Sequence, residues 1–305
     1  MNHILSGSQF ADKNLLDKIF AKAAELEKAD KNHQVPKLLA GKIIATLFYE
    51  PSTRTRLSFE SAAIKLGAGV ISVENAKAST SDVKGESLED TIKMVNCYAD
   101  AVVLRHPEAG TAERAAKVSS TPVINGGDGG NEHPTQALYD LYTIKQLLDR
   151  LDNLKVIFGF DPKHSRTIRS LAKLLAIFPG NQFIFISPKS LRPSADLIKE
   201  IESLGAKVDY GENLDAVKVA DVIYLNRLQQ ERFEDIGEFE KNRKLFILKP
   251  EHLKNSKAVV LDPLPRIDEI DVAVDALPNA KYFQQAKNGL YVRMALLLYA
   301  LSKLD

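Results

Sequence analysis

Short apolar runs alternate with helical patterns along the chain. Buried strands are predicted at 42–48, 100–104, 121–124, 155–160, 182–187, 206–210 and 221–225. Helices are predicted between them at 53–66, 87–98, 166–178 and 194–204. This alternation is typical of βαβ units, in which the strands run parallel. We therefore predict an α/β fold with two parallel-sheet α/β domains.

Two longer helical patterns are expected to join these domains. Residues 135–150 have apolar side chains near one side of a helix and no Gly-rich or Pro-rich linker beside them, which indicates a rigid connection. Residues 288–303 form a strongly apolar helix that needs a large packing surface. The predicted organisation is a first domain at 1–134, a connecting helix at 135–150, a second domain at 151–286, and a C-terminal helix at 287–305 that packs back on the first domain.

Composition narrows the class of protein. The chain has 305 residues, 45% of them hydrophobic, and its 41 basic and 40 acidic residues give a formal charge of +1. Nucleic-acid binding through phosphates needs a concentrated cationic surface, so no nucleic-acid partner is expected. The longest apolar run, Met294 to Leu301, is too short to cross a bilayer, and the first residues do not resemble a secretory signal. We expect a cytoplasmic protein with no membrane partner.

Disulfide and metal chemistry are not expected. Cys97 is the single cysteine, so the chain has no intrachain disulfide, and we interpret its side chain as a small buried hydrophobe. The 6 histidines are scattered without the spacing of metal ligands. Neither a metal nor a cofactor is therefore predicted.

The first segment with candidate chemistry follows the strand at 42–48. Pro51 ends that strand, and the next helix opens with Ser52, Thr53, Arg54, Thr55 and Arg56. Backbone N–H groups, hydroxyls and guanidinium groups meet there at the positive end of a helix dipole, which suits a phosphate. A capped helix with solvated arginines is about as common, so this segment alone leaves both interpretations open.

Two more segments follow other predicted strands, where ligands of α/β proteins bind. The segment 131–136 comes after a glycine-rich turn at 126–130, and its Pro134 fits a first helical turn that aims His133 and Gln136 at one ligand. The segment 262–266 contains two prolines and exposes backbone carbonyls that can hold an amide or an amine. Either segment alone is more often an ordinary turn.

Together the three segments resemble the carbamoyltransferase family. The motifs STRTR at 52–56, HPTQ at 133–136 and LPR at 264–266 occur in the family's order and spacing. The resemblance extends over essentially the whole chain, including 99–110 and 282–297. It implies that the first domain binds carbamoyl phosphate and the second binds an amino acid acceptor, whose amine attacks directly without a metal or a nucleophilic side chain.

The resemblance also implies the roles of individual residues. Carbamoyl phosphate would be bound by Ser52, Thr53, Arg54, Thr55, Arg105, His133, Gln136, Leu264 and Pro265. Arg54 would stabilise charge on the leaving oxygen, and Thr55, Arg105 and His133 would polarise the carbamoyl carbonyl as an oxyanion site. The general base is left open, with the departing phosphate as one candidate.

The second half of the chain favours an acceptor with two carboxylates. Ornithine-specific members typically carry a cysteine in an HCLP loop and an SMG segment, and this sequence has neither. Guanidinium groups suit a dicarboxylate, and the expected L-aspartate-binding residues are Lys84, Arg166, Arg227 and Gln229. The implied reaction yields N-carbamoyl-L-aspartate and phosphate, the committed step towards pyrimidines.

Two other functions stay open from the sequence: transfer to ornithine or another amine, and a non-catalytic protein that binds a phosphorylated metabolite. Three positions depart from the family members compared, since Thr80 replaces a serine, Val83 a basic residue and Asp262 a histidine. The resemblance also implies a homotrimer in which Lys84 reaches the active site of a neighbouring chain. Whether regulatory chains attach to form a larger assembly is left open.

Overall fold

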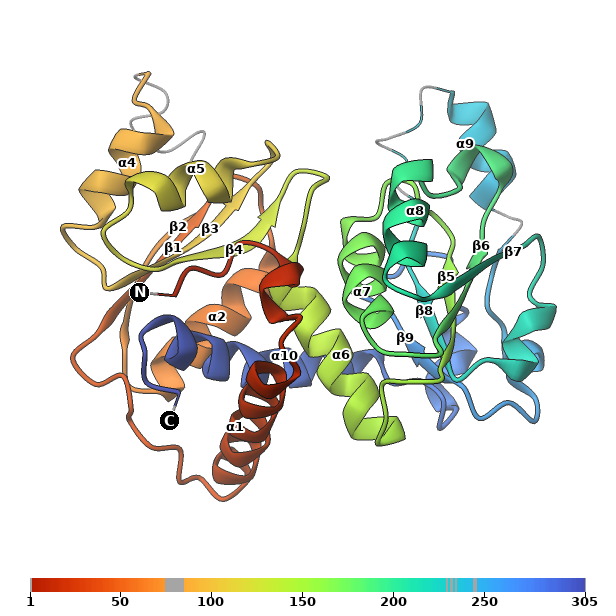
Figure 1. Cartoon of the computed structure of the whole chain (residues 1–305), viewed down its shortest axis with the longest axis horizontal. Coiled ribbons are helices and arrows are strands. Elements are labelled where there is room, and N and C mark those ends of the chain that lie inside the picture. The colour runs from red at the N-terminus through yellow and green to blue at the C-terminus, as the bar shows by residue number, and fades with distance from the viewer. Residues whose placement is uncertain are drawn as a thin grey trace. The chain divides into compact units, whose positions relative to one another are not determined.

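The computed structural model contains two α/β units (Figure 1). It describes residues 2–74, 85–228, 230, 233, 235–243 and 246–304. Unit 1 comprises Met1–Tyr139 and Lys287–Asp305, and unit 2 comprises Asp140–Ala286. Each unit is built on its own parallel sheet. The predicted α/β fold with two parallel-sheet units is confirmed.

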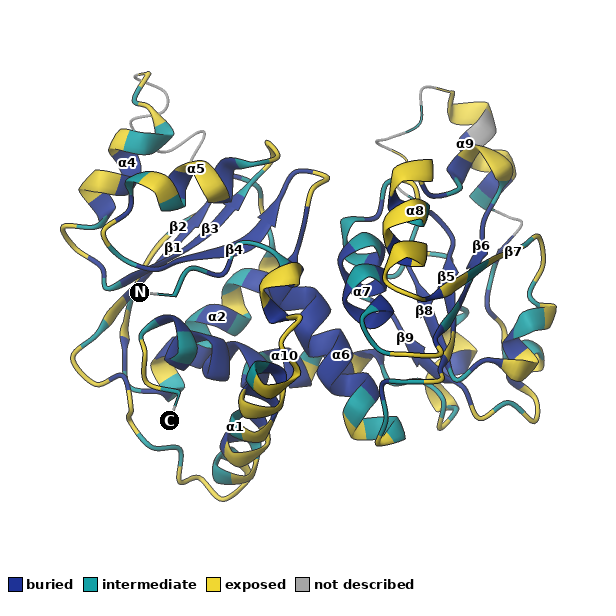
Figure 2. Cartoon of the chain, in the orientation of Figure 1, coloured by how far each residue is buried: buried dark blue, intermediate teal, exposed yellow. Residues whose placement is uncertain are grey.

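Unit 1 has a four-stranded sheet in the order β2-β1-β3-β4. Its strands are β1 (Ile43–Phe48), β2 (Gly69–Glu74), β3 (Ala101–His106) and β4 (Val123–Asp128), and its helices include α1 (Lys13–Lys31), α2 (Thr53–Lys65), α4 (Leu88–Val95) and α5 (Thr111–Val118). Helices α4 and α5 cover one face of the sheet, and α2 lies on the other (Figure 1). The inner strands β1 and β3 are almost wholly buried, whereas the edge strand β2 is partly exposed (Figure 2).

Unit 2 has a five-stranded sheet in the order β7-β6-β5-β8-β9. The strands are β5 (Lys155–Gly159), β6 (Gln182–Ile186), β7 (Lys207–Gly211), β8 (Val222–Leu225) and β9 (Val259–Leu261), and the helices include α7 (Arg166–Ala176), α8 (Ala195–Ser203) and α9 (Ile236–Arg243). Phe158 packs against Phe183, Phe185 and Tyr224 at ring-centroid distances of 5.4 to 6.0 Å. These aromatic contacts join three neighbouring strands and fill one side of the core.

Helices α6 (Pro134–Leu148) and α10 (Tyr282–Ala300) each contain a boundary between the units. Helix α6 begins at Pro134, where the missing N–H costs no helical hydrogen bond. Helix α10 begins earlier than the expected residue 288, and its part from Lys287 onward belongs to unit 1. Both helices are buried for most of their length (Figure 2). The C-terminal helix thus packs on the first unit, as predicted.

Two expectations are wrong in detail. Cys97 is exposed rather than buried, because Ile92 and Val95 occupy the inward side of α4 and Cys97 lies beyond the helix end with its Sγ near the Lys93 carbonyl. The glycine-rich segment 126–130 is not wholly a turn, since β4 continues through Asp128. Gly126 lies close to β3, since an added Cβ would be 3.2 Å from the Leu104 carbonyl oxygen, a tight contact that favours glycine.

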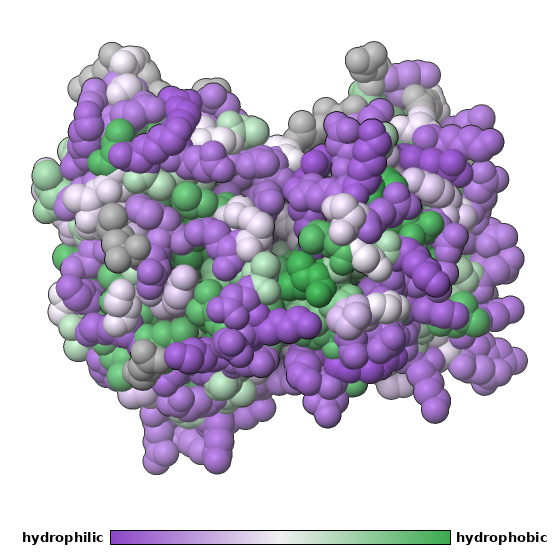
Figure 3. All heavy atoms as spheres, viewed as in Figure 1, coloured by the Kyte–Doolittle hydropathy of each residue, from purple (hydrophilic) through white to green (hydrophobic). Residues whose placement is uncertain are grey.

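The face of the molecule shown in Figure 3 is mostly hydrophilic, with apolar residues in smaller areas. This is the surface expected from the balance of hydrophobic and charged residues in the sequence. In the part of the chain that the structure describes, no helix combines the length and the apolar character needed to cross a membrane.

Candidate functional site

In unit 1, three neighbouring strands deliver the candidate residues to one edge of the sheet. Strand β1 leads to Ser52 and the start of α2, β3 carries Arg105 near its end, and β4 leads to His133 and the start of α6. Parallel strands end at the same edge, so the loops that follow β1, β3 and β4 converge there. This edge is the candidate site of unit 1.

The N-terminus of α2 is suited to bind an anion. Ser52 is the N-cap residue, and its side chain makes no capping hydrogen bond, so its hydroxyl is not committed to the helix. Thr53 and Arg54 are exposed beside it, whereas Thr55 is buried. First-turn N–H groups and the helix dipole favour negative charge at this point. Arg56 is held elsewhere, with its guanidinium 2.8 Å from the Glu74 carboxylate.

A second group of polar side chains lies buried next to this helix end. The Thr55 hydroxyl is 3.4 Å from Nε2 of His133, which is only 3% exposed. Arg105 is also buried, and it donates to the Gly126 carbonyl at 3.1 Å and to the Glu50 carboxylate at 3.1 Å. The Thr55 methyl group and the Arg105 guanidinium therefore both lie beside Gly126. Such fixed donors with little solvent around them can stabilise a developing oxyanion.

The sequence did not reveal the residues that hold Gln136. Tyr139 donates its hydroxyl hydrogen to Oε1 of Gln136, one turn earlier on α6. The guanidinium of Arg293, on α10, lies 5.1 Å from the Tyr139 ring centroid and 4.9 Å from that of Phe59, and it donates to the Ser58 hydroxyl. Arg293 is 2% exposed. An arginine inside the apolar stretch 288–303 is a sequence signal for such a buried polar role. The sequence also did not indicate the role of Glu50, whose carboxylate binds the Arg105 guanidinium.

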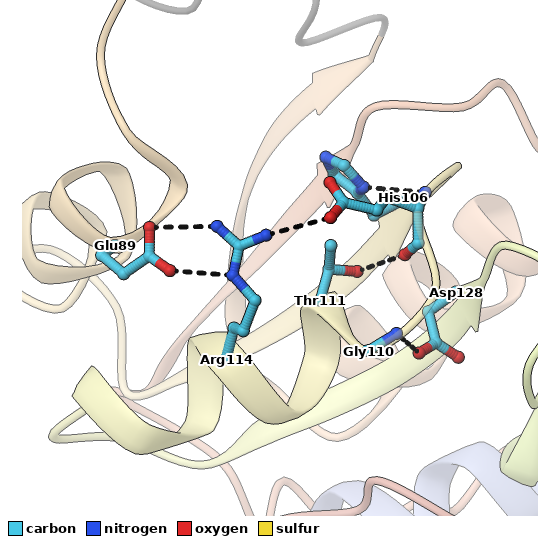
Figure 4. Close-up of polar contacts among 7 residues, drawn as sticks. Glu89, His106, Gly110, Thr111, Arg114 and Asp128 are labelled. Carbon is cyan, nitrogen blue, oxygen red and sulfur yellow. Dashed lines mark hydrogen bonds and ion pairs between the residues drawn. The ribbon is translucent and has the colours of Figure 1, made fainter.

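The loop between β3 and α5 is fixed by several polar contacts (Figure 4). The Glu108 N–H donates to Nδ1 of His106 at 3.0 Å, and the Gly110 N–H donates to the Asp128 carboxylate at 2.9 Å. Arg114 of α5 donates to Glu89 of α4 at 3.0 Å, and this hydrogen bond holds the pKa of the Glu89 carboxyl below its usual range. These contacts anchor the loop after Arg105 and the first turn of α4. Lys84, Thr80 and Val83 lie outside the described residues.

In unit 2, the candidate loops again follow neighbouring strands, namely β5, β8 and β9. Asn226, buried at the end of β8, accepts from the Asp161 N–H at 3.2 Å and donates to the Arg227 carbonyl at 3.1 Å. It thus ties the loop that carries Arg227 to the loop that leads to Arg166. Arg166 is the first residue of α7, whose N-cap Ser165 accepts from the Ile168 N–H. Gln229 lies outside the described residues.

A pocket of about 160 Å³ opens beside the end of β8. Its lining includes Arg227, Gln230, Arg243, Asp268 and Glu269, with Phe160 and Phe246 as an apolar wall. Phe160 and Phe246 stack with their ring centroids 5.2 Å apart. A guanidinium over an apolar floor suits a small anionic ligand. Two of the predicted aspartate-binding residues are described by the structure: Arg227 lines this pocket and Arg166 does not.

The loop after β9 is held rigidly. Leu264 has a left-handed φ of 58°, a conformation that costs a non-glycine residue about 1–2 kcal/mol, and its N–H donates to the Asp262 carboxylate at 2.5 Å. Arg266 binds the Asp275 carboxylate, and this hydrogen bond keeps the pKa of Asp275 below its usual range. Within the described residues, the carbonyls of Leu264 and Pro265 accept no hydrogen bond. Both are thus available to a ligand amide or amine, as the sequence predicts.

No group of three or more His, Cys, Asp or Glu side chains in the described part of the chain could hold a metal ion. The chemistry available at the candidate site of each unit is set by hydrogen-bond donors, acceptors and charge. Unit 1 offers an anion site with buried donors beside it, and unit 2 offers a pocket lined by Arg227 and two accessible carbonyls.

Comparison with known protein families identifies the family to which both units belong. Residues 2–146 match the carbamoyl-P binding domain of aspartate/ornithine carbamoyltransferase, and residues 152–300 match the Asp/Orn binding domain of that family.

Individual relatives are similar to this chain over nearly its whole length. The aspartate carbamoyltransferase catalytic subunit of Methanocaldococcus jannaschii is 45% identical over 97% of both chains. The chloroplastic enzyme of Arabidopsis thaliana is 46% identical over 97% of this chain and 77% of its own. The solved M. jannaschii catalytic subunit superposes with a TM-score of 0.92 at 44% identity, covering 99% of this chain and 98% of its own. Aspartate transcarbamoylase of Trypanosoma cruzi, in complex with N-(phosphonacetyl)-L-aspartic acid, has a TM-score of 0.90 at 33% identity, covering 97% and 94%.

The anion site on α2 can be tested with inorganic phosphate. Arg54→Ala is expected to weaken phosphate binding by about 10-fold or more, since a hydrogen bond to a charged group contributes about 1.5–3 kcal/mol. Arg56→Ala removes an identical charge two residues away, but this guanidinium is paired with Glu74 and should change the affinity little. Titration calorimetry on both variants measures the difference. Equal losses would mean that only overall charge attracts the anion.

Proposed function

Because the chain belongs to the aspartate/ornithine carbamoyltransferase family, we propose that it transfers the carbamoyl group of carbamoyl phosphate to the amino group of L-aspartate. The observation that carries this conclusion is the similarity, at 45% identity over 97% of the chain, to a catalytic subunit named for that activity. The products are N-carbamoyl-L-aspartate and phosphate, and the reaction belongs to pyrimidine biosynthesis. The enzyme is thus a transferase. A solved relative binds the same two substrates, carbamoyl phosphate and aspartate.

The first step is attack of the aspartate amine on the carbamoyl carbon. A C–N bond forms, and the carbonyl oxygen gains negative charge in a tetrahedral intermediate. Thr55, Arg105 and His133 are the donors proposed to stabilise this oxygen. The 3.4 Å contact between Thr55 and His133, and their burial, support this role because preorganised donors act strongly in a water-poor site.

The second step expels phosphate. The bond between the carbamoyl carbon and the bridging oxygen breaks, and its electron pair leaves with the phosphate, which can also take the proton lost by the amine. Ser52, Thr53 and Arg54 are proposed to hold the phosphate oxygens at the start of α2. Arg54 is exposed in the first turn of α2, where the positive end of the helix dipole lies, which supports its assignment to the charge that grows on the leaving group.

Orientation of the reacting groups accounts for the remaining residues. Gln136, fixed by Tyr139, and the carbonyls of Leu264 and Pro265 are proposed to bind the carbamoyl nitrogen and the attacking amine. Holding the two reactants in line can contribute about 7–11 kcal/mol of the barrier. No covalent intermediate is required, because carbamoyl phosphate already carries a good leaving group.

The acceptor is bound through its carboxylates. Arg166 and Arg227 follow neighbouring strands, and Arg227 lines the pocket of unit 2. Guanidinium groups match carboxylates and repel an ammonium, so ornithine is not favoured. We assign Lys84 and Gln229 to the same ligand on family resemblance.

The proposal also covers the oligomeric state of the enzyme and its location in the cell. Family resemblance supports a homotrimer in which the segment around Lys84 completes the active site of a neighbouring chain. A single exposed cysteine and a near-neutral charge are compatible with a cytoplasmic enzyme. Attachment of regulatory chains would add to this trimer without changing the residues that bind the substrates.

An acceptor assay tests the activity. Purified protein with carbamoyl phosphate is expected to release phosphate with L-aspartate and not with L-ornithine, because the second-unit pocket presents guanidinium groups to the ligand. Phosphate release and the carbamoylated product are measured together. Turnover with ornithine alone would change the assigned acceptor. Binding of carbamoyl phosphate without turnover of either amine would make the protein a binding protein.

The role of Arg227 can be separated from general charge effects. Arg227→Ala is expected to raise the KM for aspartate by about 10- to 100-fold, the loss of one charge-assisted hydrogen bond, and to leave the affinity for carbamoyl phosphate unchanged. Arg192→Ala is a matched control in the same unit, since Arg192 packs over the Tyr210 ring at 4.5 Å. Steady-state kinetics and calorimetry give the two constants. A parallel loss for both ligands would contradict the assignment.

Shared sites can be tested by complementation between two inactive variants. Arg54→Ala and Lys84→Ala trimers should each be nearly inactive, but mixed trimers formed after dissociation and reassociation contain one intact site of three. Random assortment makes about three quarters of the trimers mixed, so about one quarter of the wild-type activity should return.

The control mixes Arg54→Ala with the double variant Arg54→Ala/Lys84→Ala, which can form no intact site. Native mass spectrometry confirms that mixed trimers are present. If the first mixture stays as inactive as this control, both residues serve the same chain's site.

A further inference from the structure

The first turn of α10 is fixed beside β9, the strand that precedes the loop of residues 262–266. At the entry of the helix, the Lys281 N–H donates to the Val260 carbonyl at 2.9 Å. Gln285 lies one helical turn further on, and its backbone N–H donates to the Lys281 carbonyl at 2.8 Å. This anchoring brings the Gln285 side chain to Asp262, the first residue of the loop.

The Gln285 amide group joins two buried partners. Its Oε1 accepts from the Asp262 backbone N–H at 2.9 Å, and its Nε2 donates to Oδ1 of Asp140, on α6, at 2.6 Å. Gln285 is 1% exposed, and Asp140 is fully buried. A polar group without access to water needs a protein partner, and the amide supplies one to each neighbour. It therefore links α6 to the start of the loop.

Asp140 determines which way the Gln285 amide points. Oδ2 of Asp140 accepts from the Tyr224 hydroxyl at 2.8 Å, so donors reach both oxygens of this carboxylate. A carboxylate accepts and a backbone N–H donates, so a flipped amide would place two acceptors together at Asp140 and two donors together at Asp262. The orientation in the structure satisfies both neighbours.

The link continues from Asp262 into the loop. Oδ1 of Asp262 accepts from the Leu264 N–H at 2.5 Å, and Leu264 has a left-handed φ of 58°. Such a backbone conformation persists where the surrounding contacts impose it. An unbroken series of hydrogen bonds therefore leads from Asp140 through Gln285 to Leu264, which carries one of the carbonyls assigned to the substrates.

We propose that Gln285 and Asp140 are positioning residues that hold the Leu264 and Pro265 carbonyls in the orientation that the substrates need. Both act through the loop, and neither lines the pocket beside β8. The inference rests on the proposed function for its effect on catalysis, whereas the hydrogen-bond series itself does not. Because Gln285 binds the backbone of Asp262, this link is independent of the side chain at that position, where some family members have a histidine.

The decisive variant is Gln285→Met, which keeps the length of the side chain and removes the amide. The Asp262 N–H then lacks its acceptor, and the loop is released from α10. We expect kcat/KM to fall by about 10- to 100-fold, the size of loss caused by a small displacement of orienting groups. Gln284→Met is the matched control, since this neighbouring side chain donates to Gln146 at 3.3 Å and should leave the kinetics unchanged.

Two variants of Asp140 test the orientation of the amide from the other side. In Asp140→Asn, the side-chain oxygen can still accept from Gln285, and the nitrogen can donate to the Tyr224 hydroxyl, which also accepts. This variant should stay within about threefold of the wild type in kcat/KM. Asp140→Leu can accept from neither neighbour and should lose as much activity as Gln285→Met. Equal losses in the two Asp140 variants would contradict the proposal.

Ligand affinities separate positioning from general damage to the fold. Inorganic phosphate occupies the site at the start of α2 without using the loop, whereas the carbamoyl group of carbamoyl phosphate is held by the loop carbonyls. In Gln285→Met, calorimetry should show about a 10-fold weaker affinity for carbamoyl phosphate and an unchanged affinity for phosphate. A parallel loss for both ligands, or a loss for neither, would overturn the positioning role.

Hydrogen exchange tests the hydrogen-bond series without reference to activity. Two of the five residues in 262–266 are prolines, so a peptide of this segment reports only three N–H groups, among them those of Asp262 and Leu264. Exchange in this segment should be at least about tenfold faster in Gln285→Met than in the wild type and the Gln284→Met control.

The same rise is expected in Asp140→Leu and not in Asp140→Asn. Exchange at the wild-type rate in both Gln285→Met and Asp140→Leu would refute the hydrogen-bond series, whatever reaction the enzyme catalyses. Faster exchange with unchanged kcat/KM would overturn the positioning role and leave the proposed transferase activity untouched.

Discussion

The strands of a parallel sheet run in one direction, so their carboxyl ends all lie at the same edge of the sheet. This constraint places the functional groups of both units. In unit 1, the loops after β1, β3 and β4 bring the start of α2, Arg105 and His133 to one edge. In unit 2, the loops after β5, β8 and β9 do the same for Arg166, Arg227 and the Leu264–Pro265 carbonyls. Residues far apart in sequence meet because their strands are neighbours.

Burying polar groups at these edges requires partners for them. An isolated buried guanidinium would be very costly, and Arg105 and Arg293 are nearly inaccessible to solvent. Arg105 is bound to Glu50 and the Gly126 carbonyl, and Arg293 lies against the Phe59 and Tyr139 rings and donates to Ser58. One of these partners, Tyr139, also donates to Gln136 and so holds that side chain in place.

The sequence predicted the elements whose patterns are strong. The apolar runs of β1, β3, β5 and β6 and the helices α2 and α7 lie where expected, because a strand buried on both faces reads as a continuous apolar run. The edge strand β2 was missed, since its half-exposed residues lack such a run.

The motif residues Thr55 and His133 were predicted together, and the structure brings them into contact. The partners Glu50, Tyr139 and Arg293 could not be predicted, because their roles depend on tertiary contacts that no local pattern records. The wrong interpretation of Cys97 has the same origin: residue type favours burial, but the helix ends before that position. The roles of Lys84 and Gln229 stay predictions.

The order of the units along the chain has a consequence for protein synthesis. Unit 2 is one continuous segment, Asp140–Ala286, whereas unit 1 needs Lys287–Asp305 as well as the first part of the chain. Leu296, Leu297 and Leu298, which are buried in unit 1, are synthesised after the whole of unit 2. Unit 2 can complete its core on the nascent chain while unit 1, although synthesised first, must wait with part of its apolar surface uncovered. The order in which the two cores can be completed is therefore the reverse of the order in which the two units begin along the chain.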